Sequence, residues 1–133
     1  MQAIEEMTDN ELDEAIALEV MGWHKVNISV RPDGQMWDWW DENDRARCPA
    51  QFWWPTVALP LAFDVINALR ARDIYVYLDN EAGAGKWEIS VFTDRKGEWN
   101  TEGCWDSRLA DLERQPTVAL AICRGALMAV RAL

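Results

Sequence analysis

The sequence of 133 residues predicts an α+β fold in which three helices pack on the faces of an antiparallel sheet of about four strands. Apolar residues recur with helical spacing near residues 8–22, 60–72 and 116–130, which indicates three amphipathic helices. The β-rich segment 74–78 and the alternating segment 87–91 flank a glycine-rich turn, a pattern typical of a hairpin. Because each helix must bury its apolar face, a sheet covered by all three is expected, within a single domain over residues 1–133.

The first helix is expected to begin at a capping box, in which the Thr8 oxygen accepts from a backbone N–H while Glu11 reaches back. Gly22 is a natural stop for this helix. Residues 23–30 then predict a short strand or connector, which leads into a turn at 32–34. The apolar stripe of the helix consists of Leu12, Ala15, Ile16 and Val20.

Residues 35–58 are the most unusual part of the sequence, because five of the nine tryptophans lie there among acidic residues. The segment shows no sustained hydrophobic period and contains Pro49 and Pro55. We expect a long loop with a local strand, inserted into the domain. Loops of this length in a compact domain are more often functional.

Two further helices are expected to follow. The second begins near Pro60 and the third at Pro116, since proline suits the first turn of a helix. The hairpin of segments 74–78 and 87–91 lies between them. Residues 94–115 are polar and irregular and predict a second, acidic inserted loop.

The charge balance excludes several classes of function. Acidic residues outnumber basic ones 23 to 13, giving a net charge of −10, so direct binding to nucleic acid or to a membrane surface is not expected. The acidic N-terminus does not resemble a signal peptide, and no apolar run is long enough to span a membrane. The widely spaced Cys48, Cys104 and Cys123 favour a cytoplasmic protein without a disulfide framework, a bound metal or a cofactor.

Three stretches of the chain, taken together, resemble a known family. They are Glu11-Leu12 through Val20-Met21-Gly22-Trp23, the segment ending Ala68-Leu69-Arg70, and Ala121-Ile122-Cys123-Arg124-Gly125-Ala126-Leu127. Their order and placement, with a strand at 87–92, resemble the phage ABA sandwich domain family of small bacteriophage and prophage proteins. The chain departs from that family's pattern at 35–58 and 98–115. The resemblance implies the fold and a phage origin, but it implies no established activity and transfers no catalytic residue.

The tryptophan–acid segment carries the candidate binding residues. Tryptophan rings stack on sugars, bases or cations, and the interleaved carboxylates supply acceptors or charge. Adjacent positions on an extended chain cannot all point inward, so part of the cluster is expected at the surface. The alternative is that tryptophans such as Trp23, Trp54 and Trp87 fill a small core. The candidate binding residues are Trp37, Asp38, Trp39, Trp40, Asp41, Glu42, Asp44 and Trp53.

A second candidate surface lies at the N-terminus, where seven of the first twenty residues are acidic and none is basic. Acidic residues are favourable at a helix N-terminus, which accounts for part of this charge. A block of one sign also attracts basic partner surfaces. The predicted acidic docking face consists of Glu5, Glu6, Asp9, Asp13 and Glu14.

These patterns favour a non-enzymatic phage or prophage accessory protein that acts by binding. The expected partner is a host defence protein with a basic surface, as for a counter-defence inhibitor of the anti-CRISPR type. Catalysis by the acid pairs Asp38/Asp41 or Asp41/Glu42 is not expected, because crowded loop carboxylates are usually solvated. Alternatives are a small-ligand or nucleotide-signal sponge, a carbohydrate-binding module and a structural accessory. The apolar stripe of the last helix would also suit a homodimer.

Overall fold

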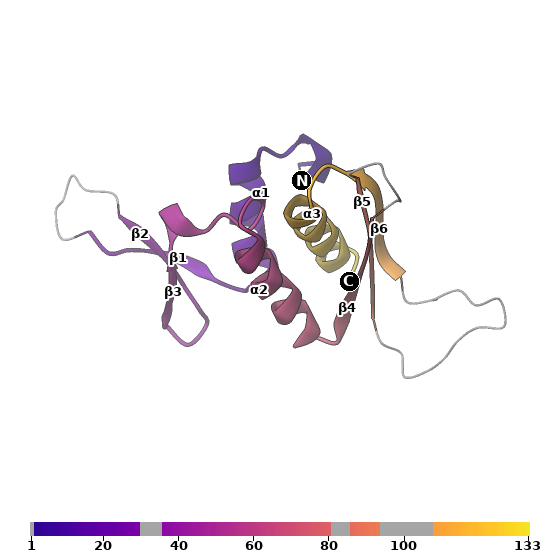
Figure 1. The fold of residues 1–133 in the computed structure, drawn as a ribbon. Coiled ribbons are helices and arrows are strands. Elements are labelled where there is room, and N and C mark those ends of the chain that lie inside the picture. Colours follow the sequence, from indigo (N-terminus) through magenta and orange to yellow (C-terminus); the bar gives the residue numbers. More distant parts are fainter. Residues whose placement is uncertain (1, 30–35, 81–85, 94–107) are drawn as a thin grey trace.

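The computed structural model describes residues 2–29, 36–80, 86–93 and 108–133 (Figure 1). The described part of the chain forms the following elements, in order: the 3₁₀ helix η1 (Ile4–Glu6), α1 (Asp9–Ala15), the π-helical segment η2 (Ile16–Val20), β1 (His24–Asn27), β2 (Trp37–Trp40), β3 (Ala46–Pro49), the 3₁₀ helix η3 (Ala50–Phe52), α2 (Leu59–Arg70), β4 (Ile74–Asn80), β5 (Trp87–Thr93), β6 (Arg108–Gln115) and α3 (Val118–Arg131).

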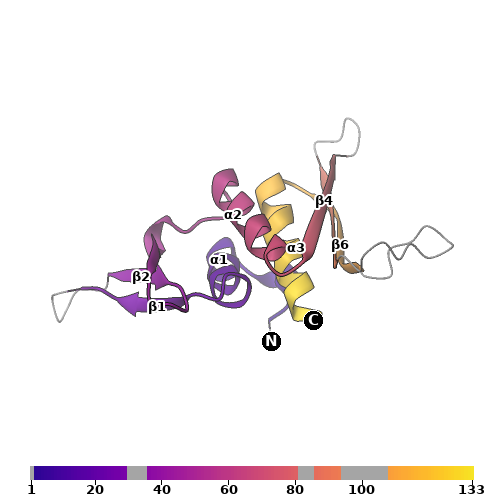
Figure 2. The same cartoon turned by 90° about the horizontal axis from the view of Figure 1, so that it is seen from below.

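The α+β class is confirmed, with a different arrangement of strands. Instead of one sheet of about four strands, two antiparallel sheets form, with the orders β1-β2-β3 and β4-β5-β6. Both views place the helices between the two sheets (Figures 1 and 2). Helix α3 packs on β5 and β6, and α2 packs on both α3 and β4. The helical layer therefore separates a first sheet, whose strands β2 and β3 come from the tryptophan-rich segment, from a second sheet that follows α2.

The predicted start and end of the first helix are confirmed. Thr8 Oγ1 accepts the Glu11 N–H at 3.2 Å, and Glu11 Oε1 accepts the Thr8 N–H at 3.1 Å. The helix continues past Ala15 as η2 and ends at Gly22, whose φ of +71° lies in the left-handed region. The two other helices also lie where they are expected. Pro60 stands in the first turn of α2, and Pro116 precedes the cap of α3.

The core centres on α3, which lies directly against the second sheet. A Cβ atom added to Gly125 would stand 2.8 Å from Cδ1 and 3.1 Å from Cγ2 of Ile89, both on a side chain that is fully buried. It would also stand 3.3 Å from Cγ2 of Val91. Glycine therefore permits the close approach of this helix to β5.

The expectation of irregular structure over residues 94–115 is wrong for its second part. Residues 108–115 form β6, which pairs with β5 so that Leu112 lies opposite Ile89 and Ala110 opposite Val91. Ala110 is buried in this strand, on which α3 packs, whereas the strand's four charged residues are exposed. Residues 94–107 lie outside the described residues, as does Cys104.

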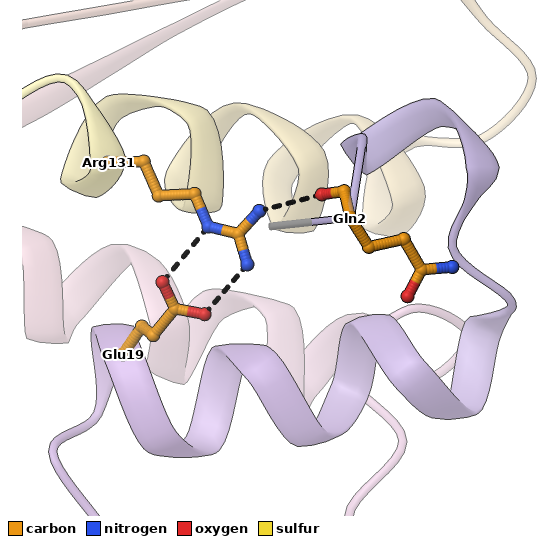
Figure 3. A network of polar contacts seen from close by, with 3 residues as sticks. All are labelled: Gln2, Glu19 and Arg131. Carbon is orange, nitrogen blue, oxygen red and sulfur yellow. Dashed lines mark hydrogen bonds and ion pairs between the residues drawn. The ribbon is translucent and has the colours of Figure 1, made fainter.

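A charged clamp ties the end of α3 to the N-terminal region (Figure 3). Arg131 donates from Nε to Glu19 Oε1 at 3.0 Å and from Nη2 to Oε2 at 2.9 Å, a bidentate pair. Its Nη1 donates to the Gln2 carbonyl oxygen at 3.2 Å. Three separate parts of the chain are thereby held together. None of the helices in the described ranges has the length and apolar character that a membrane crossing requires.

Candidate binding site

The tryptophan-rich segment is more regular than a loop. Residues 37–40 and 46–49 form β2 and β3, and β2 also pairs with β1 so that Trp39 lies opposite Lys25. The prediction of a long loop with a local strand is therefore wrong for this part. Each strand is four residues long, and the alternation of apolar and polar residues is interrupted. The strands are therefore recognised from their pairing in the sheet and not from a local sequence signal.

Two of the candidate tryptophans are buried. Trp39 is 2% exposed and Trp53 is 3% exposed, so both rings are held by packing, and the ammonium group of Lys25 lies over the face of Trp39. The Trp53 ring lies 4.7 Å from that of Trp23, and its Nε1 donates to the Asp13 carbonyl oxygen at 2.9 Å. Trp53 thus joins the segment after the first sheet to α1, and Trp39 packs into the core. Trp37 is 40% exposed and Trp40 is partly buried.

Asp41 stabilises the turn between β2 and β3. Its Oδ1 accepts the N–H groups of Asn43 at 2.9 Å and Arg45 at 3.0 Å, and Oδ2 pairs with Arg47 Nε at 3.0 Å. The backbone hydrogen bond from Arg45 lowers the pKa of this carboxyl most, followed by the other turn amide and the two arginines. Asp41 is 9% exposed, so its place among surface binding residues is corrected.

Asp13 is likewise removed from the predicted docking face, because it is 6% exposed. Its Oδ1 accepts the Thr56 N–H at 3.0 Å, which joins α1 to the segment that leads into α2. Burial raises the pKa of this carboxyl to about 6, against the opposing effect of the Thr56 hydrogen bond. Asp13 is therefore a structural carboxylate held in an unfavourable environment for its charge.

A pocket of about 220 Å³ opens between α1 and the first sheet. Its walls come from the helix, from β1 and β2 and from the segment around η3, which no local sequence pattern brings together. The residues that line it are Asn10, Asp13, Glu14, Lys25, Trp39, Ala50, Gln51, Trp53 and Trp54.

Lys25 lies at the centre of the contacts in this pocket. Its Nζ stands 5.3 Å from the centroid of the Trp39 ring and 3.5 Å from Glu14 Oε1. An ammonium group over a tryptophan face within about 6 Å is attracted by the ring. The pocket therefore combines an aromatic face and a carboxylate around one positive charge.

A second feature is an apolar strip that follows the pocket along the chain. Within residues 52–63, five large apolar side chains are between 39% and 69% exposed. The rings of the first two lie 6.4 Å apart, and the last two stand one helical turn apart on α2. We call this set the apolar strip, and it consists of Phe52, Trp54, Val57, Leu59 and Phe63.

The remaining candidates are scattered. Asp38 is partly buried, and Glu42 and Asp44 are exposed at the β2–β3 turn. Asp44 pairs with His24, Oδ1 to Nε2, at 3.6 Å. Of the predicted acidic docking face, Glu5, Glu6, Asp9 and Glu14 are exposed. No group of three or more potential metal ligands occurs within the part of the chain that the structure describes.

Sequence reasoning missed Lys25, Gln51 and the apolar strip. The alternative interpretation, in which Trp54 fills a core, is wrong for this residue, because Trp54 is 49% exposed and lines the pocket. A run of five large apolar residues around two prolines was a usable signal for the strip. Lys25 carried no signal, because its partners are distant in sequence and meet it only through the fold.

No family model and no curated protein matches the chain. The fold is similar to that of a solved structure described as a 2.0 Å crystal structure of a phage protein from Bacillus cereus ATCC 14579. The TM-score is 0.59 at 17% sequence identity, and the match covers 98% of this chain and 94% of the other. At this identity the similarity concerns the fold alone. The resemblance to the phage ABA sandwich domain family stays a prediction.

Proposed function

We propose that the chain is a cytoplasmic, non-enzymatic phage accessory protein that binds a basic surface of a host defence protein, as a counter-defence inhibitor of the anti-CRISPR type does. A phage origin is supported by the fold shared with a phage protein and by the resemblance of the three sequence stretches described above. The proposal depends on a docking surface, and the apolar strip supplies it.

The apolar strip is the observation that carries the proposal. Five large apolar side chains exposed within residues 52–63 form a concentration that single, scattered surface residues do not explain. Phenylalanine and tryptophan are also enriched at the energetic centres of protein interfaces. A partner that covers the strip gains the burial of these side chains.

Charge selects the class of partner. With a net charge of −10, two copies of the chain repel each other, whereas a basic surface is attracted. Glu14 and Trp54 both line the pocket, and Asp64 follows Phe63 in the sequence of α2, so two acidic residues occur close to members of the strip. A basic protein is therefore a better occupant than a second copy.

Binding without catalysis is supported by two buried acids, Asp41 in the β2–β3 turn and Asp13 in α1. A general acid needs a carboxyl whose pKa is raised, but hydrogen bonds lower the pKa of Asp41. Asp13, whose pKa is raised, is committed to Thr56.

A small-ligand protein is the second candidate, and the pocket beside α1 favours it. Tryptophan rings there suit a base or a sugar. Among the described residues that line the pocket, Lys25 is the one base, and it already pairs with Glu14, so phosphate groups have a poor environment.

The test is affinity capture from host lysate with the wild-type chain and the triple variant Phe52→Ser/Val57→Ser/Phe63→Ser, which leaves the pocket lining intact, followed by identification of the retained proteins. The matched control is Tyr77→Ser, which removes a 60% exposed aromatic side chain from the second sheet. We expect a basic protein that the wild type and the control retain, that the triple variant loses, and that elutes as salt rises. Retention by the triple variant, or a partner with an acidic surface, contradicts the proposal. Light scattering checks that no variant aggregates.

A further inference from the structure

We infer that the pocket beside α1 is a cation site, which Lys25 engages in the free protein and which a lysine side chain of the bound partner enters by displacing it. This inference rests on the proposed function and adds the chemical group that is recognised. It concerns the pocket, whereas the proposed function depends on the apolar strip.

The walls of the pocket provide what an ammonium group requires. The Trp39 ring faces it from a position that is only 2% exposed, so the aromatic surface is held in place by packing. The Trp53 ring is fixed by its hydrogen bond to the Asp13 carbonyl oxygen. Rigid aromatic faces with a nearby carboxylate form the type of site that binds lysine and methylated ammonium groups.

The residue now at the site is weakly held. The ion pair of Lys25 with Glu14 spans 3.5 Å between side chains that are 38% and 50% exposed. Exposed pairs of this kind contribute little to stability. Because Lys25 belongs to β1 at the pocket wall, its long side chain can turn to solvent and leave the Trp39 face to another cation. The position of Lys25 thus indicates that the pocket accepts an ammonium group.

The volume of the pocket favours a small chemical group over a larger ligand. A volume of about 220 Å³ is below the range of about 300–1,000 Å³ that is typical of pockets for drug-sized ligands. A nucleotide exceeds this space, whereas the end of one lysine side chain fits it. Trp54, 49% exposed, belongs both to the pocket lining and to the apolar strip, so a partner seated on the strip lies next to the opening.

The test uses n-butylammonium chloride, which is the lysine side chain without its backbone. The chemical shifts of the tryptophan indole N–H groups are followed by two-dimensional NMR, with 1-butanol and sodium chloride as matched controls. In the Lys25→Ala variant, we expect n-butylammonium to shift the Trp39 and Trp53 signals with up to about fivefold tighter binding than in the wild type, because the weakly held competing lysine is gone. Glu14→Gln in the same background should weaken this binding.

Lys86→Ala is the control for charge, since Lys86 is an exposed lysine before β5 and far from α1 in sequence. It should bind n-butylammonium as the wild type does. Equal shifts with 1-butanol overturn the inference, and so does unchanged affinity in Lys25→Ala. The thermal midpoint of each variant, measured without ligand, shows that it is folded.

A second experiment separates this inference from the proposed function. With the captured partner in hand, Glu14→Gln should weaken its binding about tenfold, whereas Glu42→Gln at the exposed β2–β3 turn should not. If capture depends on the apolar strip but not on Glu14, the proposed function stands and the cation site fails as part of it. If no partner is captured, the n-butylammonium titration still decides whether the pocket accepts cations.

Discussion

Individual side chains of the first sheet have different roles according to their distance from α1. Trp37 and Trp39 alternate with Asp38 along β2 and therefore share one side of the strand. Trp39 is nevertheless buried, while Trp37 is 40% exposed. The sequence shows that the two tryptophans share one side of β2, but it does not show which of them other parts of the fold cover. For this reason the sequence could identify the cluster without separating its buried members from its exposed ones.

The charge of Asp13 gives the first prediction, at the scale of one residue. Its pKa is about 6 in the folded chain and 3.8 when unperturbed, so between these values the folded state binds more protons. Stability contributed by this group is therefore present at low pH and lost as pH rises from about 4 to about 6. In Asp13→Asn, the amide oxygen still accepts the Thr56 N–H and no buried charge forms.

We expect the free energy of unfolding of Asp13→Asn, relative to that of the wild type, to rise by up to about 3 kcal/mol between pH 4 and pH 7. A shift of one pKa unit corresponds to about 1.4 kcal/mol. Urea unfolding at several pH values measures the difference, which cancels the contributions of the other acids. Glu42→Gln is the control, since Glu42 is exposed at the β2–β3 turn, whereas the charge of Asp9 itself raises the pKa of Asp13. A difference in the free energy of unfolding between variant and wild type that stays constant across this pH range contradicts the prediction.

At the scale of elements, local signals were sufficient for the helices and insufficient for half of the strands. Thr8 and Glu11 specify a helix start through bonds three residues apart, which a sequence displays directly. β6 has no such signal, because its residues pair with β5, about twenty residues earlier in the chain. β2 and β3 are equally dependent on their neighbours. Strand formation here is a tertiary effect.

Gly125 gives the prediction for this scale. Gly125→Ala improves the intrinsic preference for helix by about 1 kcal/mol, yet its Cβ would stand 2.8 Å from Ile89 Cδ1. Overpacking of a buried contact costs about 1–3 kcal/mol, so we expect a net loss of stability of about 1 kcal/mol. Unfolding in guanidinium chloride of the wild type, of Gly125→Ala and of the double variant Gly125→Ala/Ile89→Val measures this change in the free energy of unfolding.

The double variant should recover part of the loss, because valine lacks the Cδ1 atom that stands nearest. Gly22→Ala provides a contrast. It has open space around it and should lose stability only through its φ of +71°. If Gly125→Ala is more stable than the wild type, the close approach of α3 to β5 is not the constraint that we describe.

On the scale of the whole molecule, the two sheets are attached to the helices differently. The second sheet lies along α3 and is covered by a continuous core. The first sheet is attached through Trp39, Trp53 and the Asp13–Thr56 hydrogen bond. Short strands with few buried residues open at lower free energy than a central helix.

We therefore expect the amides of β1–β3 to exchange with solvent through an opening that costs less free energy than the opening of β5 and α3. Native-state hydrogen exchange with mass spectrometry measures both regions. Trp53→Phe removes the indole donor to Asp13, and it should lower protection in the first sheet by about 1 kcal/mol while α3 is unchanged. Uniform exchange across both sheets would show instead that the molecule opens as one unit.

The contact between Trp23 and Trp53 has a consequence for how the chain can change over time. The backbone leaves the helical layer at the first of these residues and returns at the second, and their rings lie 4.7 Å apart. Residues 24–29 and 36–52 thus lie between two points of the chain that are in contact, and within them Trp39 packs into the core and Lys25 pairs with Glu14 of α1. The exposed residues 42–45 of the β2–β3 turn lie outside these contacts, so this turn can be lengthened or exchanged while the helices and the second sheet keep their places. A new recognition surface can be installed at this turn without rebuilding the core.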